Sequence, residues 1–431
     1  MGFVSSRAWG LVAVWVLAAA VGCAGSDPEA PGRVLVVGLD GASLRVIEPM
    51  LKAGRLPNLE RLAREGVMGP LRSAMPMASP RIWNTIATGK GPWKHGVTDF
   101  AKPGPDGKPR LLLSSDRQTH AIWNILSERG FDVSIVNLWN TYPPEKVHGV
   151  MVSDHLLSRE VEGRETFSGA AETPTGPLIH PEALAPLLMA TLRDAEPLVD
   201  FANPFESDVA IAPNAPRKVM AKRFDEDLAL ARLTVEIDRE IRPDFTMLLL
   251  PGIDRISHHL WAGMEPPEAY PPYMRMTDAQ RLGSRAVVEA YYEFSDALLG
   301  KLFALYGPDD LVVVLSDHGF EAGVALISLT GIHEGQGALD GVFFARGPGI
   351  PAGGRLPKGS LRVVDITPTL LAWLGLPVAR DMDGQVATFL DRPSVAAIDS
   401  YDGPPIERLA HDPENANTKR IEELRALGYL E

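Results

Sequence analysis

Residues 33–39 read RVLVVGL, and Asp40 follows them directly. After the initial arginine the run is apolar and rich in β-branched side chains, which is typical of a strand buried on both faces of a parallel sheet. In open α/β sheets, ligands bind outside the carboxyl ends of the strands, which is where Asp40 would lie. The stretch therefore predicts an α/β fold with a site at that edge of the sheet.

Strand-like and helix-like segments alternate along the rest of the chain. Further strands are predicted at residues 132–138, 245–250, 310–315 and 341–345. Helices are predicted at residues 44–51, 58–65, 120–129, 224–241, 285–306 and 367–374. Strands that alternate with helices favour a mostly parallel central sheet flanked by helices on both faces.

Two stretches interrupt this alternation. Residues 155–218 are rich in Pro, Glu and Ala and have weak strand signals, so we expect an insertion that caps the sheet. The α/β domain would then comprise residues 34–154 and 219–431. Residues 264–281 contain two Pro-Pro pairs, which cannot continue a helix or a strand ladder. Long loops in compact proteins are often functional, so both stretches could shape a substrate mouth.

The composition bounds the classes of function. The chain has 431 residues, 45% of them hydrophobic, which is enough to bury a large core. Its formal net charge is −13, whereas nucleic-acid-binding domains normally carry a basic excess, so no nucleic-acid binding is expected. Cys23 is the only cysteine, so the chain can form no internal disulfide, and any metal site must use His, Asp and Glu.

The N-terminal segment has the pattern of an export signal. Residues 8–22 carry no charge and are too few to span a membrane comfortably. The segment ends in Ala20-Val21-Gly22-Cys23, which resembles a bacterial lipoprotein cleavage box whose cysteine accepts lipid. We therefore expect a signal peptide at 1–23, a linker at 24–33, and export to the periplasm or cell surface with a lipid anchor on Cys23. An uncleaved anchor, or an ordinary signal peptide with an incidental cysteine, is the alternative.

Acidic and imidazole side chains gather at the ends of the predicted strands. Six residues are of this kind: Asp40, Asp254, His258, Asp317, His318 and His333. If residues 254–258 form a helical turn, Asp254 and His258 face the same way and can bind one cation. Taken singly, Asp40 could merely cap the following helix, and a loop histidine could be a surface residue. Their coincidence at successive strand ends instead predicts a metal site.

Ser79 is the candidate nucleophile. Within residues 77–81 it would occupy the N-cap of a short helix, with Pro80 at the first helical position. Capping alone could explain a serine there. No histidine base lies beside it in the sequence, so activation of the hydroxyl would fall to a divalent metal ion.

Several short motifs follow one another along the chain. They are residues 36–42 (VVGLDGA), 79–89 (SPRIWNTIATG), 95–97 (HGV), 141–144 (TYPP), 252–254 (GID) leading to Trp261, 316–320 (SDHGF), 365–371 (DITPTLL) and 427–430 (LGYL). In this arrangement the chain resembles the alkaline phosphatase superfamily, in its branch of type I phosphodiesterases, nucleotide pyrophosphatases and predicted phosphohydrolases or phosphomutases. The resemblance covers nearly the whole chain after the N-terminal signal.

The resemblance implies a metal-dependent hydrolase of phosphate esters. One ion would be held by Asp254, His258 and His333, and the second by Asp40, Asp317 and His318, with Ser79 bridging to the second. Two zinc ions are implied, with manganese as the alternative. A phosphoseryl intermediate would form on Ser79, and the substrate would be a small phosphate ester or a lipid headgroup, either monoester or diester. A phosphoryl transferase or mutase, and a non-catalytic lipoprotein that keeps the fold, are the alternatives.

Two departures limit this comparison. Phe100 stands where nucleotide pyrophosphatases carry an asparagine that holds a phosphoryl oxygen, and Pro80 offers no backbone N–H to a phosphate. Arg81 could compensate as a bidentate phosphate partner, or could be an exposed helix residue in a salt bridge. Three further residues could line the mouth: Lys90, Lys94 and His95. Sulfatases share the fold, but their Cys/Ser-x-Pro-x-Arg motif places Pro and Arg at other offsets.

Overall fold

The computed structural model describes residues 32–104, 107–157, 176–193, 196–325, 329–410 and 421. The predictions for the signal peptide, for Cys23, for nearly all of the linker and for the motif at 427–430 lie outside the described residues. Within the described ranges, every helix is too short or too polar to span a lipid bilayer.

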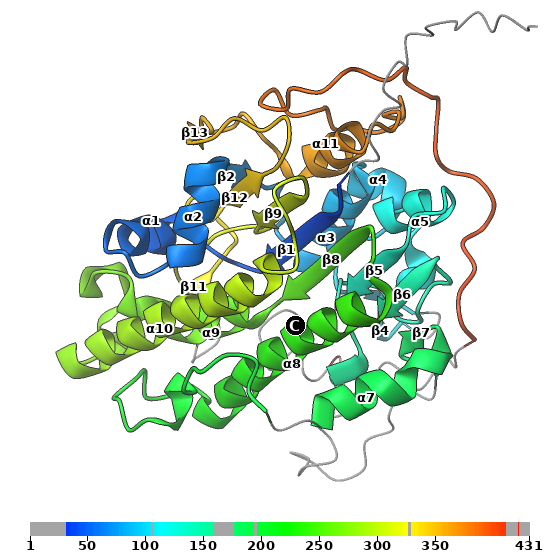
Figure 1. The fold of residues 1–431 in the computed structure, drawn as a ribbon. Coiled ribbons are helices and arrows are strands. Elements are labelled where there is room, and N and C mark those ends of the chain that lie inside the picture. The colour runs from blue at the N-terminus through cyan, green and yellow to red at the C-terminus, as the bar shows by residue number, and fades with distance from the viewer. Residues whose placement is uncertain are drawn as a thin grey trace, which may run out of the picture. The chain divides into compact units, whose positions relative to one another are not determined.

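A nine-stranded sheet forms the centre of the fold (Figure 1). In spatial order its strands are β13 (Gly354–Arg355), β2 (Val67–Arg72), β12 (Asp340–Arg346), β9 (Leu311–Leu315), β1 (Val34–Leu39), β8 (Phe245–Leu250), β5 (Val133–Val136), β6 (Gly149–Val152) and β7 (Ile179–His180). The strands from β9 to β6 run parallel, whereas β12 and β7 pair antiparallel with their neighbours in this row. The prediction of a mostly parallel sheet is confirmed.

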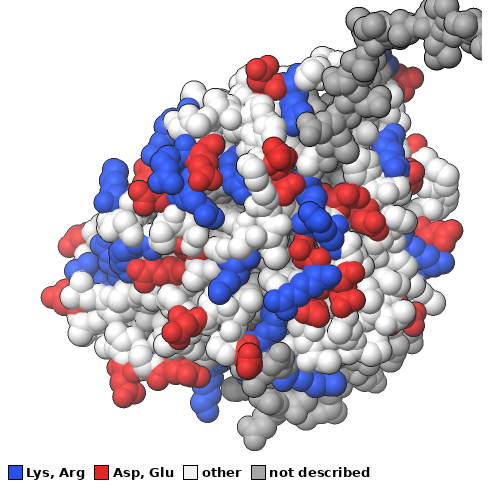
Figure 2. Space-filling model, viewed as in Figure 1, with Lys and Arg blue, Asp and Glu red and all other residues white. Residues whose placement is uncertain are grey.

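Helices and two small hairpins surround this sheet. The helices are α1 (Leu44–Lys52), α2 (Pro57–Glu65), α3 (Ser79–Thr88), α4 (Pro92–His95), α5 (Ile122–Ser127), α7 (Ala185–Arg193), α8 (Arg217–Ile241), α9 (Gly252–Leu260), α10 (Asp278–Phe303) and α11 (Ile366–Trp373). The hairpins pair β3 (Ala101–Pro103) with β4 (Pro109–Leu111), and β10 (Glu321–Ala325) with β11 (Leu329–Ile332). Lys and Arg are interspersed with Asp and Glu over the face drawn in Figure 2.

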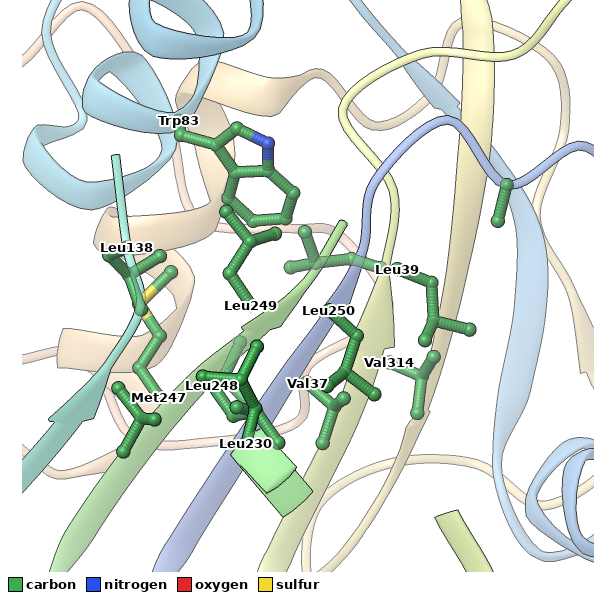
Figure 3. Packing of buried hydrophobic residues seen from close by; sticks show 14 of the residues in the cluster. Val37, Leu39, Trp83, Leu138, Leu230, Met247, Leu248, Leu249, Leu250 and Val314 are labelled. Carbon is green, nitrogen blue, oxygen red and sulfur yellow. The ribbon is translucent and has the colours of Figure 1, made fainter. Parts of the chain in front are cut away.

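The apolar strands form a core that helices cover on both sides. Successive side chains of a strand point to opposite faces, so Leu249 packs towards Trp83 of α3, and Leu248 packs towards Leu230 of α8 (Figure 3). Gly38 leaves room for the indole, because a β-carbon there would lie 2.3 Å from the Trp83 ring. The sheet is therefore covered by helices on both faces, as predicted.

The three central strands end at one edge of the sheet. β1 lies between β8 and β9, and Val34 is opposite Phe245 of β8 and Leu311 of β9. Every residue of these three strands is buried. The shared register brings the segments that follow the three strands to the same place.

Most predicted elements are confirmed, with differences at their ends. α8 begins at Arg217 rather than at 224, and α10 begins at Asp278 rather than at 285. The early start of α10 has a local cause, because the hydroxyl of Thr277 accepts a hydrogen bond from the N–H of Gln280 and caps the helix. β2 was not predicted, since its sequence VMGPLR contains Gly and Pro, which disfavour a strand.

The described part of residues 155–218 packs beside the α/β domain. β7 pairs antiparallel with β6 and so extends the edge of the sheet. α7 packs against α8, which itself begins inside this range. The division into a domain and a cap stays a prediction.

A buried ion pair fixes the segment that leads into β6. The carboxylate of Glu145 accepts a hydrogen bond from the guanidinium of Arg117, and both side chains are fully buried. Glu145 also accepts hydrogen bonds from the indole of Trp123 (2.7 Å) and the amide of Asn124 (2.9 Å). Burial lowers the pKa of the Arg117 guanidinium, although the nearby carboxylate opposes this shift.

Replacing Glu145 by alanine should strongly destabilise the protein. The substitution leaves the buried Arg117 charge without its carboxylate, which typically costs about 3–5 kcal/mol. Urea denaturation would measure the free energy of unfolding. Lys146→Ala serves as the control, because this neighbour forms an exposed pair with Glu407 that should contribute no more than about 1 kcal/mol. Equal losses in the two variants would contradict the expectation.

Candidate metal centre

Carboxylates follow each of the three central strands at the shared edge. Asp40 comes directly after β1, Asp254 lies in the first turn of α9 after β8, and Asp317 follows β9 by two residues. All three side chains are buried. The aligned ends of β8, β1 and β9 are what bring these carboxylates together.

The first group of ligand-type atoms comes from α9 and the segment after β11. One ligand atom from each of Asp254, His258 and His333 lies within 4.8 Å of the others. Nε2 of His258 lies 3.6 Å from Oδ1 of Asp254, one helical turn away, as the four-residue spacing predicted. We call these three residues the first triad.

The second group joins the ends of β1 and β9. Ligand atoms of Asp40, Asp317 and His318 lie within 4.8 Å of one another, and we call these residues the second triad. Nε2 of His318 is 3.4 Å from Oδ2 of Asp317 and 3.7 Å from Oδ1 of Asp40. It is also 3.8 Å from Oδ1 of Asp254, so the two triads are adjacent. The resemblance to the family implied the same two groupings.

Ser79 lies beside the second triad. Its buried hydroxyl donates a hydrogen bond of 3.4 Å to Oδ1 of Asp40. α3 begins one residue earlier than expected, with Ala78 in extended conformation at the N-cap, so the prediction that Ser79 caps the helix is wrong. Asp40 does not cap α1 either, because the hydroxyl of Ser43 accepts the hydrogen bond there.

The histidine orientations fit a bound cation. Nδ1 of His258 donates to the carbonyl of Gly331 (3.0 Å), and Nδ1 of His318 donates to the carbonyl of Gly319 (3.0 Å). Each ring therefore turns the lone pair of Nε2 towards a carboxylate oxygen, an arrangement of two electron-rich atoms that a cation between them would stabilise. Burial lowers the pKa of His258 to about 3, which keeps this imidazole neutral and able to ligate.

The pKa shifts of the three carboxylates also fit a bound cation. Burial, with the charge of Asp317 second, raises the pKa of Asp40 well above its usual value, and burial with the charge of Asp40 does the same for Asp254. Burial raises the pKa of Asp317 to about 7. Three clustered carboxylates in a medium of low dielectric are costly as anions, and a divalent cation reverses that cost.

An acidic pair on α8 holds α9, which carries Asp254 and His258. Oδ2 of Asp227 accepts hydrogen bonds from the backbone N–H of Gly252 (3.2 Å) and the hydroxyl of Tyr291 (3.0 Å). Oε2 of the preceding Glu226 accepts one from Arg255 (2.6 Å). Burial raises the pKa of Asp227 to about 7. Sequence reasoning missed this pair, although consecutive acids on the buried face of a long helix were a signal.

Trp139 is a third residue that sequence reasoning missed. Its indole N–H donates to Oδ2 of Asp40 (3.3 Å), and the ring of Phe100 packs edge-on against it with centroids 5.3 Å apart. Phe100, which stands at the position of the expected asparagine, therefore supports the indole. No charge or motif marked Trp139 in the sequence.

The three other residues that could have lined the substrate mouth form contacts with other parts of the protein. The ammonium of Lys90 is buried between Asp381 and Asp402, at 2.7 Å from each. Lys94 pairs with Asp383. Nε2 of His95 lies 3.1 Å from the hydroxyl of Thr85, and burial lowers its pKa to about 3. The two lysines attach the segment 381–402 to the region around α3 and α4.

Arg81 lies in the first turn of α3 and is half-buried. Burial lowers the pKa of its guanidinium, and the charge of Asp99 opposes this shift. Arg81 follows Ser79 by two residues on the same helix, so its side chain points in a direction about 200° around the helix axis from that of the serine. Its role in substrate binding stays a prediction.

Comparisons with known proteins identify the family and the fold of this chain. The family model described as type I phosphodiesterase / nucleotide pyrophosphatase matches residues 34–368. A search of curated proteins found no match. A phosphonoacetate hydrolase from Sinorhizobium meliloti 1021 is 18% identical, with 68% of this chain and 58% of that chain covered and a TM-score of 0.42.

Two further solved structures superpose on this chain with higher TM-scores than that hydrolase. A 2-O GAG sulfatase is 14% identical over 83% of this chain and 73% of its own, with a TM-score of 0.51. A protein from Bacteroides thetaiotaomicron VPI-5482 named as a sulfatase is 14% identical over 83% and 74%, with a TM-score of 0.52. At these identities the likeness shows the fold alone, which is that of alkaline phosphatase. By its match over residues 34–368, the chain belongs to the type I phosphodiesterase / nucleotide pyrophosphatase family, phosphoric ester hydrolases of the alkaline phosphatase superfamily.

Proposed function

We propose that this protein hydrolyses phosphate esters with Ser79 as nucleophile and two divalent metal ions held by the two triads. The observation that carries the proposal is the position of the Ser79 hydroxyl, 3.4 Å from Oδ1 of Asp40, next to two adjacent triads of ligand-type atoms. The family supports phosphate-ester chemistry in general.

The donor sets support zinc, with manganese as the alternative. Each triad mixes imidazole nitrogen with carboxylate oxygen, a combination that suits either ion, and the two histidines of the first triad favour zinc there. When bound, such ions neutralise the charge of the phosphoryl group and lower the pKa of a coordinated hydroxyl.

The chain itself would supply the nucleophile and its orientation. Oγ of Ser79 loses its proton and forms a bond to phosphorus while the bond to the leaving oxygen breaks, so the phosphoryl group passes to Ser79 and the leaving group departs as the protonated alcohol. Ser79 is the first residue of the ten-residue helix α3, whose N-terminus favours the negative charge of a phosphate. Water then cleaves the phosphoserine, which restores the hydroxyl. A non-catalytic relative would be expected to lack a ligand or the serine, and none is missing.

The substrate we propose is a small phosphate ester or a lipid headgroup. The formal charge of −13 and the mixed charges in Figure 2 support a partner other than nucleic acid. The N-terminal pattern that ends at Cys23 supports export to the periplasm or cell surface.

Ser79→Ala should abolish turnover. Loss of a nucleophile removes a step that no neighbouring group replaces, so kcat/KM for bis-nitrophenyl phosphate and nitrophenyl phosphate should fall at least about 10³-fold. Ser295→Ala is the matched control, because this buried serine of α10 lies outside the triads and donates its hydroxyl to the carbonyl of Tyr291 in the same helix. Wild-type rates in Ser79→Ala would exclude Ser79 as the nucleophile.

Removal of metal should abolish activity and lower the thermal midpoint Tm. A chelator would leave the three clustered carboxylates without a cation, and refilling with zinc or manganese should restore both properties, because an ion that binds only the folded state stabilises it. Metal analysis should find one ion fewer per chain in His258→Asn and in Asp317→Asn. His120→Asn, at a buried histidine outside the triads, should keep the full metal content. Full activity of the stripped protein would contradict the proposal.

Cys23→Ser tests the anchor. If Cys23 carries lipid, the substitution should move the protein from the membrane fraction to the soluble fraction of cells and end its labelling by palmitate. Unchanged membrane association would point to an uncleaved N-terminal span instead.

A further inference from the structure

The loop at residues 137–141, after β5, is held on both sides. Oδ2 of Asp154, after β6, accepts a hydrogen bond from the backbone N–H of Asn140 (3.0 Å), and its Oδ1 accepts from the N–H of Thr141 (3.3 Å). On the other side, the amide of Asn137 donates to the carbonyl of Leu249 in β8 (3.1 Å). The loop is thus fixed to both neighbouring strands of the sheet.

This loop reaches two parts of the metal centre. The indole N–H of Trp139 donates to Oδ2 of Asp40 (3.3 Å). Oδ1 of Asn140 accepts from the amide of Asn84 (2.8 Å), which also donates to the carbonyl of Pro80 in the first turn of α3. The same five residues therefore contact a carboxylate of the second triad and the helix that begins with Ser79.

The two oxygens of Asp40 have different partners. Oδ1 faces the hydroxyl of Ser79 (3.4 Å) and Nε2 of His318 (3.7 Å), whereas Oδ2 is occupied by Trp139. We propose that Trp139 is a positioning residue that holds Oδ2 of Asp40 and so keeps Oδ1 turned towards Ser79 and His318, where the second triad would hold a metal ion. The inference rests on the proposed function, because it assumes that this triad binds a metal ion.

An indole suits this role chemically. Its N–H is a donor only, so it can fix a carboxylate oxygen without competing with that carboxylate for the cation. The edge-on contact of Phe100, with rings at 85°, and the fixed loop together leave the indole little freedom to turn. Groups that orient a metal ligand in this way typically change metal affinity by about 10–100-fold.

Zinc binding to Trp139→Phe tests the proposal. The variant keeps an aromatic ring but removes the donor, so the zinc affinity of the second triad should fall about 10–100-fold. Competition against a chromophoric chelator would measure it, both in the full chain and in the His258→Asn background, where the first triad is impaired. Activity at limiting zinc should fall, and excess zinc should restore it.

Trp123→Phe is the matched control. Trp123 also donates an indole N–H to a buried carboxylate, that of Glu145, and neither residue belongs to the triads. This variant should lose thermal stability but bind zinc as tightly as the wild type. If the effect of Trp139→Phe came from a general loss of packing, both variants would lose zinc affinity and activity alike. Excess zinc would then not restore the activity of Trp139→Phe.

Three results separate the outcomes. Wild-type zinc affinity in Trp139→Phe would overturn the role of Trp139, even with a catalytic Ser79. Absence of zinc or manganese binding in the wild-type protein would overturn the proposed function and this inference together. If Trp139→Phe does not fold, Asp154→Asn releases the same loop while keeping the indole. This variant should also lower the zinc affinity of the second triad. An unchanged affinity in Asp154→Asn would equally count against the proposal.

Discussion

The site depends on one electrostatic constraint: three buried carboxylates meet where three parallel strands end. Asp40, Asp254 and Asp317 are each almost completely shielded from water, so their charges repel one another through a medium of low dielectric. The protein offers two neutral imidazoles, His258 and His318, with their Nε2 lone pairs facing these oxygens. A bound cation would compensate this negative charge, so charge balance and ligand geometry favour the same occupant.

Much of this arrangement could be predicted, because it depends on positions next to strands. An apolar run that ends in an acid fixes that acid at the edge of the sheet, which is how Asp40 and Asp317 were found. The four-residue spacing of Asp254 and His258 gave their common direction on a helix. His333 was predicted on weaker grounds, since it lies in a loop, and the resemblance to a family supplied its grouping.

The rest could not be predicted, because it depends on contacts between distant segments without a charge pattern. Trp139 is a neutral residue in a loop, and only the three-dimensional path of that loop brings it to Asp40. Lys90 and Lys94 looked suited to an anionic substrate, yet acids roughly 290 positions away bind them. β2 could not be predicted because its Gly and Pro disfavour a strand. Pairing with β12 outweighs this local propensity.

The parallel register of β1 between β8 and β9 has a consequence for quality control during folding. A strand that pairs one residue out of step would displace Asp40 by about 3.3 Å, and would turn every side chain of the strand to the opposite face. Such a displacement is comparable to the whole spread of a triad, whose ligand atoms span at most 4.8 Å. If the triads bind metal ions as proposed, only chains with the correct strand register would gain the stabilisation that ion binding provides.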